Sequence, residues 1–328
     1  MRRNIYFLCA LLLLASACEF GPQDATPQAA PTATFTPAAT LPPTPAIPPG
    51  FQPNTAYFRD RLAVMDAFIL YLTGVTQPPA GQVYQAWLFT PTGEALNLGA
   101  PEGPDADGLL SLDWASPSSE NLAGRYTRFQ LTLESAAGGS QPAGQVAYAG
   151  ELDEAALPTI TRLFVRNDGE PATPQETALA AGLQAGMRQV LQLISSAASA
   201  AQSGGQAEMR LNLEQVINLL EGAQGAYYQD YDGDGTVGDP GDGFGVKGYA
   251  WETAILLGEQ ADPALKAFDD QANGLQELCA QLIQLASLDQ AAEQMNALQQ
   301  AAKTLQNGPT ADLYGLAQAQ LSFAVEAP

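Results

Sequence analysis

The sequence contains no histidine. This absence excludes Ser-His-Asp and Cys-His nucleophilic catalysis, histidine-ligated haem and most catalytic zinc centres. Cysteine is scarce as well, with three residues in the whole chain. Cys9 and Cys18 lie at the N-terminus, so Cys279 is the only thiol of the predicted folded part and we expect no intrachain disulfide there. Apolar residues flank Cys279 at helical spacing, which predicts a buried structural thiol.

Basic residues are also few. The chain has 13 of them against 35 acidic residues, and its formal net charge is −22. Phosphate backbones repel such a chain, so we expect no nucleic-acid partner. Anionic lipid headgroups repel it too, which makes a covalent lipid more necessary for membrane attachment. A second apolar stretch, Ala67 to Val75, is far too short to span a bilayer. We expect neither haem nor a nucleotide as cofactor.

The N-terminus has the parts of a secretory signal. Arg2 and Arg3 precede an apolar run from Ile5 to Leu14, and small residues then lead to Cys18. A cysteine at this place resembles the lipobox of bacterial lipoproteins, although Leu14 stands one residue earlier than is usual. The resemblance implies a signal peptide over residues 1–17 and a lipid on Cys18, with several acyl chains for stable anchoring. Plain secretion is the alternative. We therefore expect the chain at the cell membrane, lipid-anchored on its extracytoplasmic side.

Residues 18–54 form a predicted linker after the lipid site. Proline, threonine and alanine dominate it, and such a segment buries too little apolar surface to offset its ordering entropy. Proline favours extended conformations of about 3.1 Å per residue. The linker is interpreted as a stalk that holds the folded part away from the lipid, or as a simple spacer.

Residues 55–172 have the pattern of an antiparallel β-sandwich-like domain. Short segments rich in β-formers alternate with turns made of glycine and proline. The clearest predicted strands are Ala67 to Leu72, Val83 to Phe89, Arg125 to Leu133 and Gln145 to Ala149. Their aromatic residues, among them Trp87, are expected in the sandwich core.

Four pieces of this domain occur in an order that resembles a known family. A proline-rich turn within Leu72 to Gly81 precedes the strand Val83 to Leu88, and the strand Leu131 to Glu134 precedes the turn Gly138 to Gly144. The order resembles the C-terminal extracytoplasmic domain of anti-sigma-K factors. The resemblance implies an extracytoplasmic sensing or interaction module without catalytic residues. Members of that family also have a sigma-binding domain and a membrane helix, and we expect neither in this chain.

Residues 173–328 are predicted to form an α-helical bundle, since alanine, glutamine and leucine replace the β-branched residues. The fold class is therefore α+β multidomain, with an N-terminal sandwich followed by helices. Apolar residues at three-to-four spacing predict a bundle of about four to six helices. The candidate segments are 177–202, 209–220, 251–257, 265–288, 290–305 and 310–325.

An aspartate-rich loop, residues 230–242, separates the second and third predicted helices. Carboxylates at alternate positions followed by Gly235 resemble the opening of an EF-hand-type calcium loop. The predicted ligands are Asp230, Asp232, Asp234, Thr236, Asp239 and Asp242. Gly241 stands where such loops place their last acidic ligand, and Asp239 or Asp242 is the expected substitute. A solvated acidic turn is the alternative to a calcium site.

These features favour a lipid-anchored, extracytoplasmic binding or interaction protein that is not an enzyme and that calcium stabilises. Its partner would be an envelope protein or another envelope ligand. One alternative is an accessory of envelope-stress or anti-sigma-type signalling, which acts through a membrane-spanning partner. A second is a carboxylate-dependent hydrolase, because paired carboxylates cleave glycosides. This hydrolase is less favoured, since the acidic residues cluster in a metal-like loop instead of flanking an evident groove.

Overall fold

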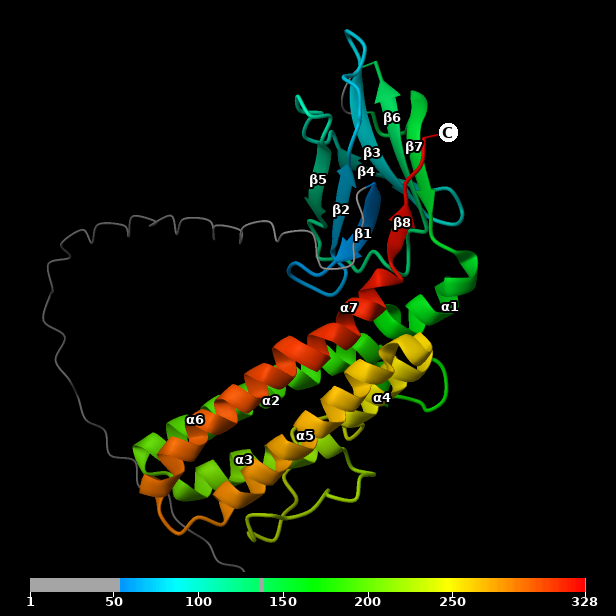
Figure 1. Cartoon of the computed structure of the whole chain (residues 1–328). Coiled ribbons are helices and arrows are strands. Elements are labelled where there is room, and N and C mark those ends of the chain that lie inside the picture. Colours follow the sequence, from blue (N-terminus) through cyan, green and yellow to red (C-terminus); the bar gives the residue numbers. More distant parts are fainter. Residues whose placement is uncertain (1–53, 136–138, 328) are drawn as a thin grey trace, which may run out of the picture. The chain divides into compact units, whose positions relative to one another are not determined.

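The N-terminal part of the chain and one C-terminal strand form two four-stranded antiparallel sheets (Figure 1). The computed structural model describes residues 54–135 and 139–327, so the signal sequence, Cys18 and nearly all of the predicted linker lie outside the described residues. One sheet has the strand order β5-β2-β1-β8 and the other has the order β4-β3-β6-β7. The strands are β1 (Thr55–Arg59), β2 (Ala67–Leu72), β3 (Val83–Phe89), β4 (Ala95–Gly99), β5 (Leu110–Ala115), β6 (Arg128–Glu134), β7 (Gln145–Glu151) and β8 (Ser322–Ala324).

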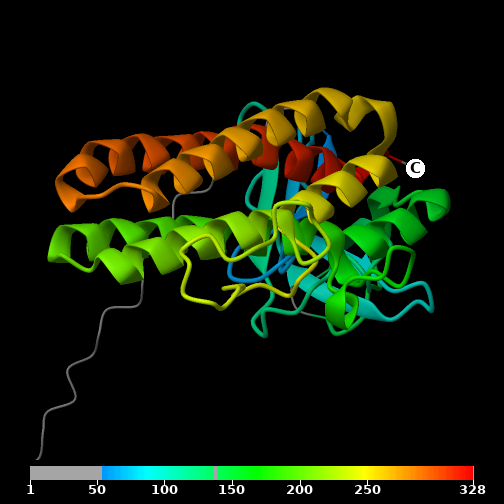
Figure 2. The same ribbon diagram turned by 90° about the horizontal axis from the view of Figure 1, so that it is seen from below.

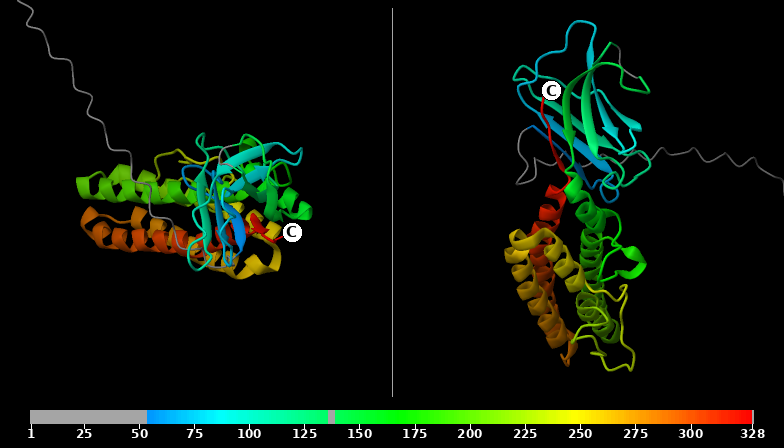
Figure 3. Two further views of the ribbon diagram at one scale, coloured as in Figure 1. Left: turned by 90° about the horizontal axis from the view of Figure 1, so that it is seen from above. Right: turned by 90° about the vertical axis from the view of Figure 1, so that its right-hand side faces the viewer.

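Aromatic rings join the two sheets, which face each other in Figure 3. Phe68 on β2 lies 5.4 Å from Phe129 on β6, measured between ring centroids. Phe58 and Phe323 complete the cluster from β1 and β8. Trp87 is fully buried and donates its indole N–H to Thr132 Oγ1 at 2.9 Å. The predicted sandwich is therefore confirmed, and Phe129 lies in its core as expected, whereas Trp87 is buried outside the core cluster.

The end of the chain differs from the prediction. The sequence pattern predicts a helix through Val325, but α7 ends at Ala319 and residues Ser322–Ala324 form β8. β8 pairs antiparallel with β1, and Ala149 on β7 forms a β-bridge with Glu326. Phe323 is fully buried among the sandwich aromatics, and burying such a ring contributes about 1.5–3 kcal/mol. This tertiary contact outweighs the helical pattern of the preceding residues.

The helical part packs its longest helices lengthwise, as Figure 2 shows for α2, α3, α5 and α6. α2 contacts α3, α4 and α6, and α5 contacts α3 and α6. Leu183, Met187 and Val190 all lie on the buried face of α2, as the three-to-four spacing predicts. The helices are α1 (Leu157–Ile160), α2 (Leu179–Ser203), α3 (Gln206–Glu221), α4 (Val246–Leu257), α5 (Asp262–Ile283), α6 (Leu288–Leu305) and α7 (Ala311–Ala319).

Short 3₁₀ and π turns lie between these helices. Two of them flank α1, at Glu154–Ala156 and Thr161–Val165, and another, Pro174–Glu176, precedes α2. The others are Gly258–Ala261 and Gln306–Thr310. Within residues 54–135 and 139–327, no helix combines the length and the apolar character that crossing a bilayer requires.

Candidate metal centre

The acidic loop lies in the connection between α3 and α4, residues 222–245. Two glycines bring the two ends of this connection together, and we call this place the neck of the loop. Gly222 has φ +80°, and a Cβ there would lie 2.6 Å from the Phe244 carbonyl oxygen. Gly245 has φ +83°, and a Cβ there would lie 2.6 Å from the Gly222 nitrogen. Because only glycine tolerates both this conformation and this approach, the neck brings the end of α3 against the start of α4.

Aspartate side chains organise the loop by accepting backbone hydrogen bonds. Asp230 accepts from the N–H groups of Gly233 and Gly235, at 2.7 and 2.9 Å. Asp232 accepts from the Asp234 N–H at 3.0 Å, and Asp234 accepts from Thr236 at 2.7 Å. These turns curl the backbone around the first two aspartates. An EF-hand loop joins its two helices directly, whereas here Asp230 comes well after the end of α3 at Glu221.

Glu214 on α3 holds the loop against the helix. Its side chain is fully buried, and both carboxylate oxygens accept hydrogen bonds from the loop backbone. Oε2 accepts from the N–H groups of Tyr231 and Asp232 at 2.7 and 2.9 Å, and Oε1 accepts from Gly238 at 2.6 Å. A charged acceptor with three donors offsets much of the cost of burying its charge. Glu214 is not among the ligands that the sequence pattern predicted.

Glu214, Asp230 and Asp232 form a carboxylate cluster. Their nearest oxygens all lie within 4.8 Å of one another. Two unit charges at that separation repel by roughly 3 kcal/mol at an effective dielectric constant of about 20. A hard divalent cation that accepts oxygen ligands at flexible geometry would remove this repulsion, and calcium has both properties. Of the predicted ligands, Asp230 and Asp232 are therefore the two that the fold brings together, with Glu214 as a third donor.

The other predicted ligands lie apart from this cluster or are engaged elsewhere. Asp234 and Thr236 are exposed. Asp239 accepts a hydrogen bond from the Gly241 N–H at 2.8 Å and lies beside the Tyr228 hydroxyl. Asp242 accepts from the Phe244 N–H at 3.0 Å and from the Tyr249 hydroxyl. Neither carboxylate belongs to the cluster of Glu214, Asp230 and Asp232.

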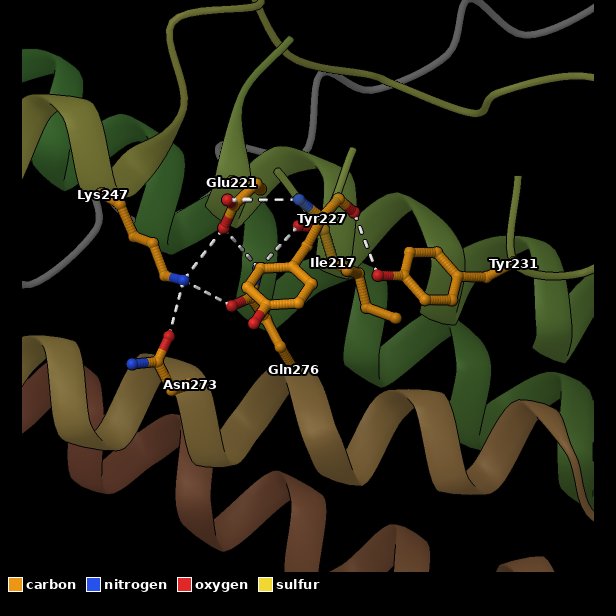
Figure 4. Close-up of polar contacts among 7 residues, drawn as sticks. All are labelled: Ile217, Glu221, Tyr227, Tyr231, Lys247, Asn273 and Gln276. Atoms are coloured by element: carbon orange, nitrogen blue, oxygen red, sulfur yellow. Dashed lines mark hydrogen bonds and ion pairs between the residues drawn. The ribbon is translucent and has the colours of Figure 1, made fainter. Parts of the chain in front are cut away.

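A second polar network lies beside the loop, where Lys247 joins three helices (Figure 4). Its ammonium group donates to Glu221 Oε2 on α3 at 2.9 Å. It also donates to Asn273 Oδ1 at 2.7 Å and Gln276 Oε1 at 2.5 Å, both on α5. Gln276 in turn donates to Glu221 Oε2 at 3.2 Å. We call these four residues the Lys247 clamp.

The clamp changes the acidity of Glu221. Burial disfavours the charged carboxylate, but the hydrogen bonds from Lys247 and Gln276 outweigh burial, so the pKa of Glu221 lies below its ordinary value. The clamp was not predicted, because its hydrogen-bonded partners lie 26 to 55 residues apart in the sequence. Cys279, by contrast, is fully buried as expected, and burial raises the pKa of its thiol.

Comparison with protein families gives a match over the first part of the chain. The family model described as "Anti-sigma-K factor rskA, C-terminal" matches residues 7–146. The match confirms the resemblance seen in the strands and turns, and it ends at the start of β7. It covers less than half of the 328 residues and reaches neither the helices nor the acidic loop. No curated protein and no solved structure matches the chain.

Proposed function

We propose that the chain is a lipid-anchored, extracytoplasmic binding protein and not an enzyme, with a helical part that calcium stabilises. The observation that carries the calcium proposal is the convergence of Glu214, Asp230 and Asp232 within 4.8 Å. A buried carboxylate from a helix and two carboxylates from a tightly turned loop offer oxygen ligands from both sides. Extracellular calcium is abundant enough for a site with a Kd of about 10⁻⁴ to 10⁻³ M to be filled.

The anchor proposal rests on Cys18 and the signal-like residues before it. The match to an anti-sigma-K factor family supports association with a membrane at the level of the family. We expect the intact mass of protein extracted from membranes to include diacylglycerol and a fatty acyl chain on Cys18. Cys18→Ser should move the protein from the detergent phase to the aqueous phase. An unmodified N-terminus on a cytosolic species would refute the anchor.

Calcium binding is tested by thermal unfolding of the full-length mature protein. At 100 times its Kd, calcium raises the free energy of unfolding by about 2.7 kcal/mol. Asp230→Asn plus Asp232→Asn should abolish the rise in melting temperature. Asp107→Asn plus Asp312→Asn, which removes the same charge from two exposed sites outside the loop, should keep it. An intact protein whose melting temperature calcium leaves unchanged would contradict the proposal.

The family match favours a second candidate function, an accessory role in anti-sigma-type signalling. Such a role needs a membrane-spanning partner to carry a signal inward. Crosslinking in native membranes, followed by affinity capture, is expected to retain such a partner. Capture that yields none would count against signalling and leave the binding role intact.

A further inference from the structure

A pocket of about 520 Å³ lies between the acidic loop and α5. We call it the tyrosine pocket, and its lining includes Tyr227, Gln229, Tyr231, Asn273, Gln276 and Glu277. Its volume falls within the range of small-molecule sites, about 300–1,000 Å³. The pocket joins two aromatic rings to three amides and one carboxylate, so it offers both an apolar face and hydrogen-bonding groups.

Successive residues of the loop contribute alternately to this pocket and to the carboxylate cluster. Gln229 and Tyr231 line the pocket, whereas Asp230 and Asp232 join Glu214 in the cluster. The backbone bends at residues 229, 231 and 232, and successive side chains contribute to different sites. The segment therefore presents one face for a cation and the other for a different ligand.

The backbone of Tyr227 is held in place, and the residue is 59% exposed. The backbone N–H of Tyr227 donates to Glu221 Oε1 at 3.4 Å, and its carbonyl accepts from the Tyr231 hydroxyl at 3.0 Å (Figure 4). Lys247 Nζ lies 6.0 Å from the ring centroid. Because its backbone is already anchored, this exposed ring can take up a stacked ligand without the cost of ordering the loop around it.

Polar groups in the pocket have unused hydrogen-bonding capacity. In the part of the chain that the structure describes, the side chains of Gln229 and Glu277 have no hydrogen-bond partner, and neither has the Tyr227 hydroxyl. Asn273 Oδ1 accepts from Lys247, which leaves the amide N–H groups of Asn273 as donors. A ligand with several hydroxyl groups would satisfy donors and acceptors together.

The charges around the pocket favour neutral over anionic ligands. The nearest ammonium group, on Lys247, is neutralised by Glu221 at 2.9 Å. Glu277 adds an unpaired carboxylate, and the chain carries a net charge of −22, so anionic ligands are repelled. A neutral sugar ring offers weakly positive C–H groups to the negative face of tyrosine and hydroxyl groups to the amides.

From this combination we infer that the tyrosine pocket binds a neutral carbohydrate, with Tyr227 as the stacking platform and Gln229, Asn273 and Glu277 as hydrogen-bonding groups. This inference rests on the proposed role as a binding protein and names a ligand class for it. It does not need the cation, because Glu214 and Asn218 on α3 hold the loop. Asn218 Oδ1 accepts from the Gln229 N–H at 3.1 Å, and Asn218 Nδ2 donates to the Gln229 carbonyl at 3.0 Å.

The test uses the full-length mature protein on a printed array of neutral oligosaccharides, followed by calorimetric titration of the strongest hit. We expect at least one saccharide to bind, both with calcium and with EDTA. Tyr227→Ala should weaken binding by about tenfold or more, since it removes the ring that the sugar covers. Tyr227→Phe keeps the ring and should stay within about threefold. Trp251→Ala, which removes an exposed aromatic ring of α4 outside the pocket, should have no effect.

Several results would overturn the inference. These are an array without a hit, binding that Tyr227→Ala leaves unchanged, or saturable binding of a lysine-rich peptide in place of any saccharide. Circular dichroism of each variant checks that the helices are intact. Because binding is measured on purified protein with and without EDTA, a failure here is distinct from a failure of the anchor or of the calcium site.

Discussion

Replacing Lys247 by methionine should cost the protein much of its stability. Lys247 and Glu221 expose only 19% and 10% of their side chains, so Glu221 would remain a nearly buried carboxylate without its cation. Removing one partner of a buried pair costs about 3–5 kcal/mol. Gln276 still donates to Glu221 and some water reaches the site, so we expect the lower end, about 3 kcal/mol. At about 2–4 °C per kcal/mol, the melting temperature should fall by roughly 6–12 °C.

A matched control separates burial from the mere loss of a salt bridge. Lys266 donates to Asp270 at 2.6 Å, but these side chains are 78% and 66% exposed. Lys266→Met should therefore cost no more than about 0.5 kcal/mol. Lys247→Met with Glu221→Gln should recover part of the lost stability, because the second change removes the unpaired charge. Urea unfolding followed by circular dichroism measures all four proteins.

The same variant has a defined pH dependence. The pKa of Glu221 in the folded protein lies below its ordinary value, so its ionised form stabilises the fold. This contribution is complete above the ordinary glutamate pKa of about 4.3 and is lost as the pH falls through the lower native pKa. The difference between the parent protein and Lys247→Met should therefore shrink in acid. Equal losses for Lys247→Met and Lys266→Met at pH 7 would refute the reasoning.

Three further outcomes are expected. Glu214→Gln should reduce the calcium-induced rise in melting temperature by more than half, and an undiminished rise would exclude Glu214 as a ligand. Cys279 should react with a thiol reagent only in denaturant, because the folded protein buries it completely and raises the pKa of its thiol; rapid labelling of native protein would contradict this. Gly144→Ala should lower the urea midpoint of the sandwich, since the added Cβ would lie 1.9 Å from the Leu133 carbonyl oxygen. A midpoint equal to that of the parent would refute that steric account.

The strand and turn segments that resemble the anti-sigma-K factor domain are held together by hydrogen bonds. Trp87 donates to Thr132 Oγ1, and Thr132 donates to Glu134 Oε1 at 2.6 Å. Glu134 also accepts from the Ala143 N–H at 3.2 Å, in the turn that follows β6. The strand residues and the turn residues of the motif are therefore parts of one hydrogen-bonded unit. Its pattern is readable in the sequence because its members lie on neighbouring strands and one turn.

Sequence patterns predicted the elements whose burial is periodic. Alternation revealed β6, and three-to-four spacing revealed α2, because each buries one regular face. β8 escaped prediction, since Ser322–Ala324 is too short to show a period and its partner β1 lies at the other end of the folded part. The signal for Glu214 was a carboxylate next to Leu213 and Val216 on an otherwise apolar face, which marks a buried acid in need of donors.

Only part of the site at the acidic loop was predictable from the sequence, because residues distant in the chain also contribute to it. The repeat of aspartates identified the loop, because alternate carboxylates are visible in the sequence. Its third carboxylate comes from α3, and the opposite wall of the tyrosine pocket comes from α5. Glu214 bonds the N–H groups of Tyr231 and Asp232, so α3 fixes the segment that serves both faces. The tyrosine pocket is therefore formed whether or not a cation occupies the carboxylate cluster. We expect the two sites to bind independently unless a ligand moves this segment away from α3.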